Sequence, residues 1–246
     1  MRRMLHSRPE PHRPRVPTGT RVYAIGDVHG RFDLLGETLS RIDADLKADP
    51  APRVLQVLLG DYVDRGPSSR KVIDLLISRS RTHETHCLKG NHEALLLNFL
   101  HDPDTLPAWE KVGGIETLDS YGLAPLLKEY PRQPAELASY FDLALPKSHR
   151  QFLMQLRPSF VCGDFFFVHA GVRPGIPLAD QRETDLLWIR REFLTHKREF
   201  GKIIVHGHTP VAKPEVRSNR INIDTGAFAT GCLTCLKLDD DEIGFI

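Results

Sequence analysis

Residues 58–66 read LLGDYVDRG and place the side chains of Asp61, Asp64 and Arg65 directly after an apolar run. Ionised side chains are rarely buried unless they are paired or bound to a metal. Carboxylates that converge on one place become tolerable when metal cations neutralise them, and a guanidinium offers a planar fork that matches phosphate oxygens. The stretch therefore predicts a metal site with a phosphate group above it.

The same arrangement, an apolar run followed at once by Gly, Asp, Asn or His, occurs five times. The segments are VYAIGDVHG, VLLGDYVDRG, CLKGNHE, FFFVHAG and IIVHGHTP, which supply Asp27, His29, Asp61, Asp64, Arg65, Asn91, His92, Glu93, His169, His206 and His208. In an open α/β sheet, sites form at the carboxyl ends of the strands. Each motif alone is compatible with a structural role, but their joint occurrence at strand ends predicts one shared site.

The residue types indicate the chemistry of that site. Asp, His and an Asn carbonyl suit divalent Mn, Fe or Zn, and the set contains no thiolate. Two metals about 3.5–4 Å apart form the usual clamp for in-line displacement at phosphorus. The sequence thus predicts a dinuclear metal centre that acts on a phosphoester.

Short β-rich runs alternate with amphipathic helical segments in the first part of the chain. Strands are expected at 21–25 and 54–59, and helices at 32–46 and 68–80. This rhythm predicts a largely parallel sheet that is covered on both faces. Residues 95–157 read as a helical insertion, after which strands return. Residues 1–19, rich in Pro, Arg and His, are expected to be a flexible tail, and 20–246 a single domain.

In the order GDVHG, GDYVDRG, GNHE, HAG and GHT, the motifs resemble the phosphoprotein phosphatase (PPP) family of serine/threonine phosphatases, within the calcineurin-like metallophosphoesterases. The small size is similar to that of the bacterial and phage members. The resemblance implies an α/β fold, a layered α/β/β/α sandwich with the helical insertion beside it. It also implies a metal-dependent serine/threonine protein phosphatase that hydrolyses phosphomonoesters by direct attack of a metal-bound hydroxide, without a phosphoenzyme.

The resemblance further implies a role for each matching residue. Asp27, His29 and Asp61 would bind one metal, with Asp61 bridging, and Asn91, His169 and His208 would bind the other. His92 would be the general acid, and Asp64 would orient it. Phosphate would be contacted by Arg65, Asn91 and an arginine of LLWIRR that is assigned to Arg190, with Arg191 as the alternative register. Two divalent ions are implied, with Mn expected and Fe or Zn as alternatives.

A second substrate class uses the same kind of site. Related tetraphosphatases that cleave dinucleoside polyphosphates typically carry VARG and GNHD, where this chain has VDRG and GNHE. Pro210 also replaces the final histidine of the G-H-x-H motif found in many metallophosphoesterases. These differences favour a phosphorylated protein or peptide as substrate, and dinucleoside polyphosphates or other small phosphoesters remain the alternative. A catalytically inactive binding module would have lost a ligand or the acid, and none is missing.

Composition limits the other function classes. The chain has 246 residues with 33 basic and 32 acidic side chains, which argues against nucleic acid or an anionic membrane as a partner. No apolar run approaches the length of a membrane span, and the four cysteines are too few for a disulfide scaffold. A cytoplasmic enzyme is expected. Cys232 and Cys235 are interpreted as residues of one strand, and His206 and Asp224 receive no firm role.

Overall fold

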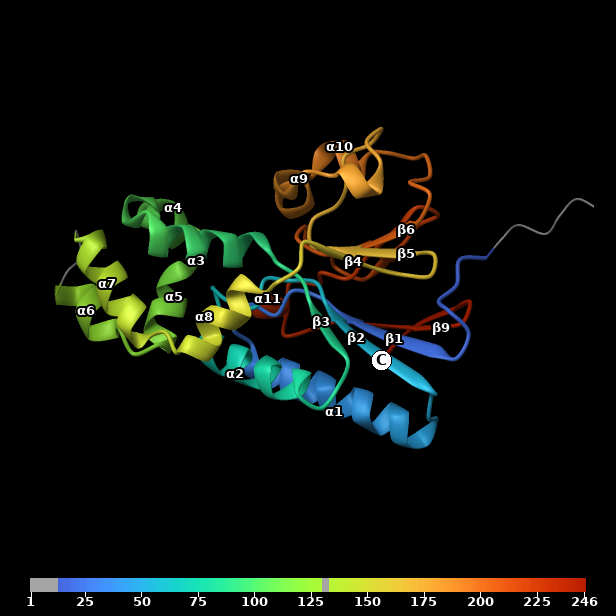
Figure 1. The fold of residues 1–246 in the computed structure, drawn as a ribbon, viewed down its shortest axis with the longest axis horizontal. Coiled ribbons are helices and arrows are strands. Elements are labelled where there is room, and N and C mark those ends of the chain that lie inside the picture. The colour runs from blue at the N-terminus through green and yellow to red at the C-terminus, as the bar shows by residue number, and fades with distance from the viewer. Residues whose placement is uncertain (1–12, 130–132) are drawn as a thin grey trace, which may run out of the picture.

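The computed structural model describes residues 13–129 and 133–246, and its sheets and helices form four layers (Figure 1). Two five-stranded sheets face each other in the middle. Helices α1 (Phe32–Ala48) and α2 (Ser69–Ser80) cover the outer face of the first sheet, and α9 (Glu183–Trp188) and α10 (Arg191–Leu194) cover that of the second. The predicted α/β/β/α sandwich is confirmed.

The first sheet has the strand order β10-β9-β1-β2-β3. Its strands β1 (Thr20–Ile25), β2 (Arg53–Leu58) and β3 (Thr85–Cys87) are parallel, whereas β9 (Cys235–Asp239) and β10 (Glu242–Phe245) are added antiparallel. The chain therefore leaves the first sheet after β3 at one edge. Its last two strands, β9 and β10, are added on the opposite side of β1.

The second sheet has the order β4-β5-β6-β8-β7 and is also mixed. Its strands are β4 (Ser159–Cys162), β5 (Phe165–Val168), β6 (Ile203–His206), β7 (Glu215–Val216) and β8 (Arg220–Asn222). Strands β5, β6 and β8 are parallel, and β4 and β7 are antiparallel edges. The parallel arrangement predicted for the first part of the chain is confirmed by β1, β2 and β3. The antiparallel strands that make both sheets mixed were not predicted, because an apolar strand pattern reports burial and does not identify the pairing partner.

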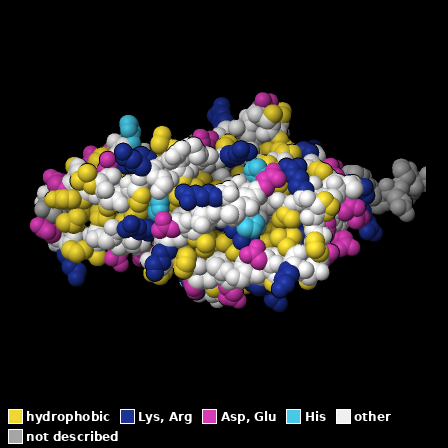
Figure 2. Space-filling model, turned by 60° about the horizontal axis from the view of Figure 1, so that its bottom comes forward, with side chains coloured by type: hydrophobic (Ala, Val, Ile, Leu, Met, Phe, Trp, Pro, Cys, Tyr) yellow, Lys and Arg dark blue, Asp and Glu magenta, His cyan; other side chains and the backbone are white. Residues whose placement is uncertain are grey.

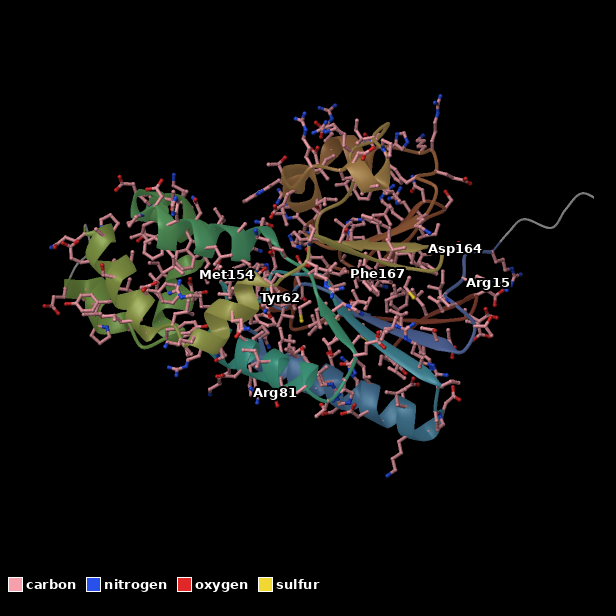
Figure 3. The ribbon with its side chains drawn as sticks, viewed as in Figure 1. Arg15, Tyr62, Arg81, Met154, Asp164 and Phe167 are labelled. Atoms are coloured by element: carbon pink, nitrogen blue, oxygen red, sulfur yellow. The ribbon has the colours of Figure 1, made fainter. Side chains whose placement is uncertain are left out.

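Successive side chains of the central strands point alternately into two different cores, so both faces of these strands are apolar. In β1, Val22 and Ala24 join the core between the sheets, and Tyr23 and Ile25 join the core under α1 and α2. In β5, Phe167 lies between the sheets (Figure 3), and Phe166 packs under α9 and α10. Because successive side chains of a strand point to opposite faces, a strand covered on both sides reads as one continuous apolar run.

In the sequence, a series of helices separates β3, of the first sheet, from β4, of the second. They are α3 (Asn91–His101), η1 (Pro103–Thr105), α4 (Leu106–Glu110), α5 (Gly114–Ser120), α6 (Ala124–Glu129), α7 (Pro134–Ala144) and α8 (Lys147–Met154), and they lie beside the sandwich in Figure 1. The aromatic rings of Phe99, Trp109 and Phe141 pack at centroid distances of 5.1–6.4 Å in their core. Most of the described residues in the segment predicted as an insertion thus lie in helices.

The segment predicted as a tail lies partly outside the described residues, which begin at position 13. Within residues 13–19, Val16 is buried between the sheets and donates its N–H to the Asp240 carbonyl at 2.9 Å. The Arg15 N–H donates to the Asp164 carboxylate at 3.0 Å, and the two residues lie near each other in Figure 3. The division into a tail and one domain stays a prediction.

Three further predictions concern the surface charge, the absence of a membrane span and the cysteines. On the face shown in Figure 2, basic and acidic side chains are interspersed, as the balanced composition implies. No helix within the described ranges is long and apolar enough to cross a membrane. All four cysteines are free; Cys235 is buried in β9, but Cys232 is exposed and precedes that strand, so the interpretation of both as strand residues was wrong for Cys232.

Candidate active site

The five predicted segments meet where parallel strands of both sheets end. Asp27 follows β1, Asp61 follows β2, Asn91 begins α3 just after β3, His169 follows β5, and His208 follows β6. Asp61 belongs to two groups of possible metal ligands whose donor atoms lie within 4.8 Å of one another. One group is Asp61 with His29 and His92, and the other is Asp61 with His169 and His208.

The second group is the tighter one. The Asn91 Oδ1 atom lies 2.8 Å from His169 Nε2 and 2.8 Å from His208 Nδ1. Those two nitrogens are 3.2 Å apart, and His169 Nε2 is 3.4 Å from Asp61 Oδ1. Carboxylate, amide and imidazole donors thus surround one small volume, which is the donor set that divalent transition metals prefer.

On the other side of Asp61, its Oδ2 atom lies 3.5 Å from His29 Nε2. Asp27 is buried here; its Oδ2 accepts the His208 N–H at 3.0 Å, but its Oδ1 has no hydrogen-bond partner. Burial, together with the carboxylates of Asp224 and Asp61, raises the pKa of Asp27 well above its ordinary value. A cation bound between these carboxylates would satisfy the orphaned oxygen and remove the repulsion, so the residues fit a metal.

Two backbone carbonyls fix the orientation of the histidines. The Nδ1 atom of His29 lies 2.9 Å from the Val63 carbonyl, and that of His169 lies 3.0 Å from the Leu59 carbonyl. Since a carbonyl only accepts, each Nδ1 carries the proton and each Nε2 presents its lone pair toward Asp61. Burial lowers the pKa of His29 to about 3 and lowers that of His169 as well, which keeps both rings neutral as metal ligation requires.

The loops that carry the ligands have a strained backbone. Positive φ angles occur at His29 (46°), Asp61 (53°), Asp64 (71°), Arg65 (66°) and His208 (65°). Such conformations are costly for residues other than glycine and persist only where the surroundings impose them. Gly90 shows how tight the packing is, because a Cβ atom there would lie 2.1 Å from the Asp61 carboxylate.

The buried carboxylate of Glu93 holds this loop in place. Its Oε2 accepts the N–H groups of Asp61 and Gly90, both at 2.9 Å, and its Oε1 accepts that of Tyr62 at 2.7 Å. Glu93 is the last residue of the GNHE motif, and no role was predicted for it from the sequence. The structure shows that it connects the loop after β2 to the start of α3.

Replacing Glu93 by glutamine is expected to destabilise the protein. An amide NH₂ would face backbone N–H donors, and each N–H left without an acceptor costs about 1–3 kcal/mol. Urea denaturation should show a lower midpoint, with the exposed Glu37→Gln on α1 as the control that leaves it unchanged. An unchanged midpoint for the Glu93 variant would show that this carboxylate does not hold the loop.

His92 and Asp64 form a buried pair beside the metal ligands. The His92 Nδ1 atom is 2.7 Å from Asp64 Oδ2, and its Nε2 atom is 3.7 Å from Asp61 Oδ2. Burial alone would lower the pKa of His92, but the charge of Asp61 and the hydrogen bond to Asp64 raise it above its ordinary value. The ring can therefore carry a proton on Nε2, the nitrogen that faces the centre.

Two residues from the helical segment hold Asp64, and neither was predicted from the sequence. The Trp109 Nε1–H donates to Asp64 Oδ2 at 2.8 Å, and the Thr117 hydroxyl donates to Asp64 Oδ1 at 2.7 Å. Both side chains are fully buried. Neither residue follows a strand or belongs to a recognisable motif, so no sequence signal connected them to the site.

Replacing Thr117 by valine is expected to reduce turnover about 10- to 100-fold, because small losses of alignment at a reacting group have effects of that size. The valine keeps the shape but removes the hydrogen bond to the Asp64 carboxylate and the acceptor of the Asp64 N–H at 2.8 Å. The turnover number should fall while KM stays nearly constant. Thr38→Val in α1, also buried, is the control for the general cost of losing a buried hydroxyl. Equal turnover in the two variants would contradict the positioning role of Thr117.

The arginines lie on opposite sides of the site. The Arg190 Nε–H donates to His208 Nε2 at 3.0 Å, and Arg191 is an exposed residue at the start of α10. An Arg65 nitrogen lies 3.4 Å from His92 Nε2. The structure thus places Arg190, rather than Arg191, against a predicted ligand, and Arg65 beside the predicted acid His92. The roles of these residues stay predictions.

The two residues without a firm prediction are also placed. His206 is fully buried and packs edge-on against the ring of Phe193 at 4.9 Å. The Asp224 carboxylate accepts the Gly226 N–H at 2.9 Å and adds its charge to that around Asp27. His206 is therefore a core side chain, and Asp224 shapes the turn that borders the site.

Comparison with known proteins supports the broader of the two predicted classes, the calcineurin-like metallophosphoesterases, and does not single out the PPP protein phosphatases. The profile of the calcineurin-like phosphoesterases matches residues 20–233. The chain is 30% identical to the bis(5'-nucleosyl)-tetraphosphatase PrpE [asymmetrical] of Geobacillus thermodenitrificans, over 87% of this chain and 88% of the relative. It is 28% identical to the PrpE of Anoxybacillus flavithermus, over 89% of this chain and 90% of the relative.

Solved structures add evidence on the fold alone. A cold-active protein tyrosine phosphatase superimposes with a TM-score of 0.59 at 17% identity, over 94% of this chain and 81% of that one. The profile match covers the strand ends, the donor groups around Asp61 and the His92–Asp64 pair. The chain belongs to the calcineurin-like phosphoesterase family.

Proposed function

We propose that the protein is a metal-dependent hydrolase that cleaves dinucleoside polyphosphates. The observation that carries the proposal is the position of Asp61, which is shared by both donor groups and lies next to the His92–Asp64 pair. The substrate class follows the two bis(5'-nucleosyl)-tetraphosphatases, which match nearly the full length of the chain. These relatives favour the alternative of the sequence analysis over its first choice, a phosphorylated protein.

In this proposal, the chain's own residues bind the substrate and move one proton. Water adds to one phosphorus, the bond to the leaving nucleotide breaks, and His92 donates its Nε2 proton to the departing oxygen. Arg65, Asn91 and Arg190 bind the phosphate oxygens. Two divalent cations, held by the six predicted ligands, would supply Lewis acidity and lower the pKa of bound water. That these ions are Mn remains a prediction.

A second candidate is the hydrolysis of phosphoserine or phosphothreonine, and the buried His92–Asp64 pair favours it. A serine or threonine alkoxide is a poor leaving group and needs a proton from a general acid. A nucleotide phosphate leaves far more easily and needs that proton less. Here the buried Asp64 holds the acid His92 and is itself held by Trp109 and Thr117, so the chain is equipped for the more demanding reaction.

One experiment separates the two candidates. Chelator-stripped protein is assayed with and without added Mn²⁺ on diadenosine tetraphosphate and, in parallel, on a phosphothreonine peptide. Mn-dependent cleavage of the dinucleotide with no phosphate release from the peptide supports the proposal. The reverse result replaces it by the second candidate. No hydrolysis of either compound by protein shown to bind metal overturns both.

A further inference from the structure

Two exposed aromatic side chains border the candidate active site on different elements. Phe228 lies in the short helix α11 (Ala227–Thr230) and is 37% exposed, and Trp188 ends α9 and is 45% exposed. A single exposed aromatic residue is ordinary on a protein surface. Here, however, each ring stands edge-on against a predicted metal ligand, Phe228 against His29 at 5.5 Å and Trp188 against His208 at 6.2 Å.

Each ring is also accompanied by a predicted phosphate-binding arginine. The Arg65 guanidinium carbon lies 4.6 Å above the centre of the Phe228 ring. Arg190 follows Trp188 by two positions and donates to the same histidine that Trp188 contacts. On either side of Asp61, the chain therefore presents the same set of groups: a histidine ligand, an arginine and a partly exposed aromatic ring.

This arrangement matches a ligand with phosphates in its middle and an aromatic group at each end. Nucleobases stack on aromatic rings and on the planes of arginine guanidinium groups, whatever their sequence identity. Stacking changes affinity about 5- to 150-fold per base. Phosphate oxygens, in turn, suit the two arginines.

We propose that Trp188 and Phe228 are stacking surfaces for nucleobases, one on each side of the metal centre. The inference deepens the proposed function and rests on it for the identity of the substrate. The base-binding role itself follows from the exposure and placement of the two rings. Trp188 and Phe228 would thus select nucleotides over other phosphoesters without taking part in the chemistry.

The distribution of tryptophan allows a direct test. The chain has two tryptophans; Trp109 is fully buried, and only Trp188 is exposed to a ligand. Intrinsic fluorescence of the Mn-loaded protein is titrated with AMP and with ribose 5-phosphate, which differ by the base. We expect AMP to quench the fluorescence and to bind at least about tenfold more tightly than ribose 5-phosphate. Equal affinities for the two compounds would overturn the proposal.

Variants assign the preference to the two rings. Calorimetric titration should show that Trp188→Ala and Phe228→Ala each weaken AMP binding about tenfold and change ribose 5-phosphate binding less than twofold. The conservative variants Trp188→Phe and Phe228→Tyr should restore most of the preference. Phe245→Ala in β10 is the matched control, since that ring is 44% exposed but lies on an edge strand of the first sheet. A preference that survives both alanine variants would refute the stacking role.

The test can fail independently of the proposed function. If the protein cleaves diadenosine tetraphosphate but binds AMP and ribose 5-phosphate equally, the function stands and the stacking surfaces do not. If AMP is preferred and the preference depends on Trp188 and Phe228, the stacking surfaces stand even when the dinucleotide is not cleaved. Circular dichroism of the alanine variants shows whether they are folded, and the restored binding of the conservative variants provides a second check.

Discussion

Replacing Asp61 by asparagine is expected to remove metal from the protein and to abolish hydrolysis. Asp61 is the only residue shared by the two groups of possible ligands among the described residues. Burial works to raise its pKa, but the four surrounding histidines hold that pKa below the usual range, so Asp61 supplies a full negative charge. Asparagine supplies one neutral oxygen, and both metals would lose a ligand.

The expected loss in metal affinity exceeds about 100-fold, because changing residues that only support a ligand already costs 10- to 100-fold. The fold should survive, since asparagine tolerates the positive φ of 53° at this position. Metal content is measured by elemental analysis after dialysis against a weak chelator, beside the melting temperature and the rate of hydrolysis.

Asp240→Asn is the matched control for this substitution. Asp240 is also an aspartate at positive φ (50°), and it lies in the exposed turn before β10. This control should keep both metals and full activity. An Asp61→Asn protein that still binds two metal equivalents would show that Asp61 does not bridge the site.

Replacing His92 by asparagine is expected to lower turnover roughly 10²–10⁴-fold, the usual contribution of a general acid, on a substrate whose leaving group needs a proton. Metal content should stay nearly intact. The physical reason is the geometry of the ring. His92 directs Nδ1 to Asp64 at 2.7 Å, which leaves only Nε2 for the substrate. Asparagine can keep a hydrogen bond to Asp64 but cannot deliver a proton.

The leaving group provides a specific check on the role of His92. The loss of turnover should be large for phenyl phosphate, whose leaving group needs a proton, and much smaller for p-nitrophenyl phosphate, whose leaving group does not. His101→Asn, at the exposed end of α3, serves as the control. His92 also lies within reach of Asp61 as a possible ligand, so a His92 variant that loses metal would reassign it from acid to ligand.

The contribution of the sequence is clearest at the strand ends. An apolar run followed by Asp, Asn or His is a local pattern, and the carboxyl ends of parallel strands meet by the geometry of the sheet. For that reason, the local patterns alone assign residues as distant in the chain as Asp27 and His208 to one site. Their side-chain types then restrict the chemistry to a metal centre acting on phosphate.

The tertiary structure decided what local patterns do not encode. Trp109 and Thr117 contact Asp64 from helices α4 and α5, which do not directly follow a strand. Their roles therefore depend on how the helical segment packs against the sandwich. The same holds for Trp188 and Phe228, which meet the site from α9 and α11. The pairing of strands into two mixed sheets was also open, because burial makes strands apolar whichever partner they have. The sequence alone thus determined which side chains form the candidate site, and long-range packing determined which residues hold them and border them.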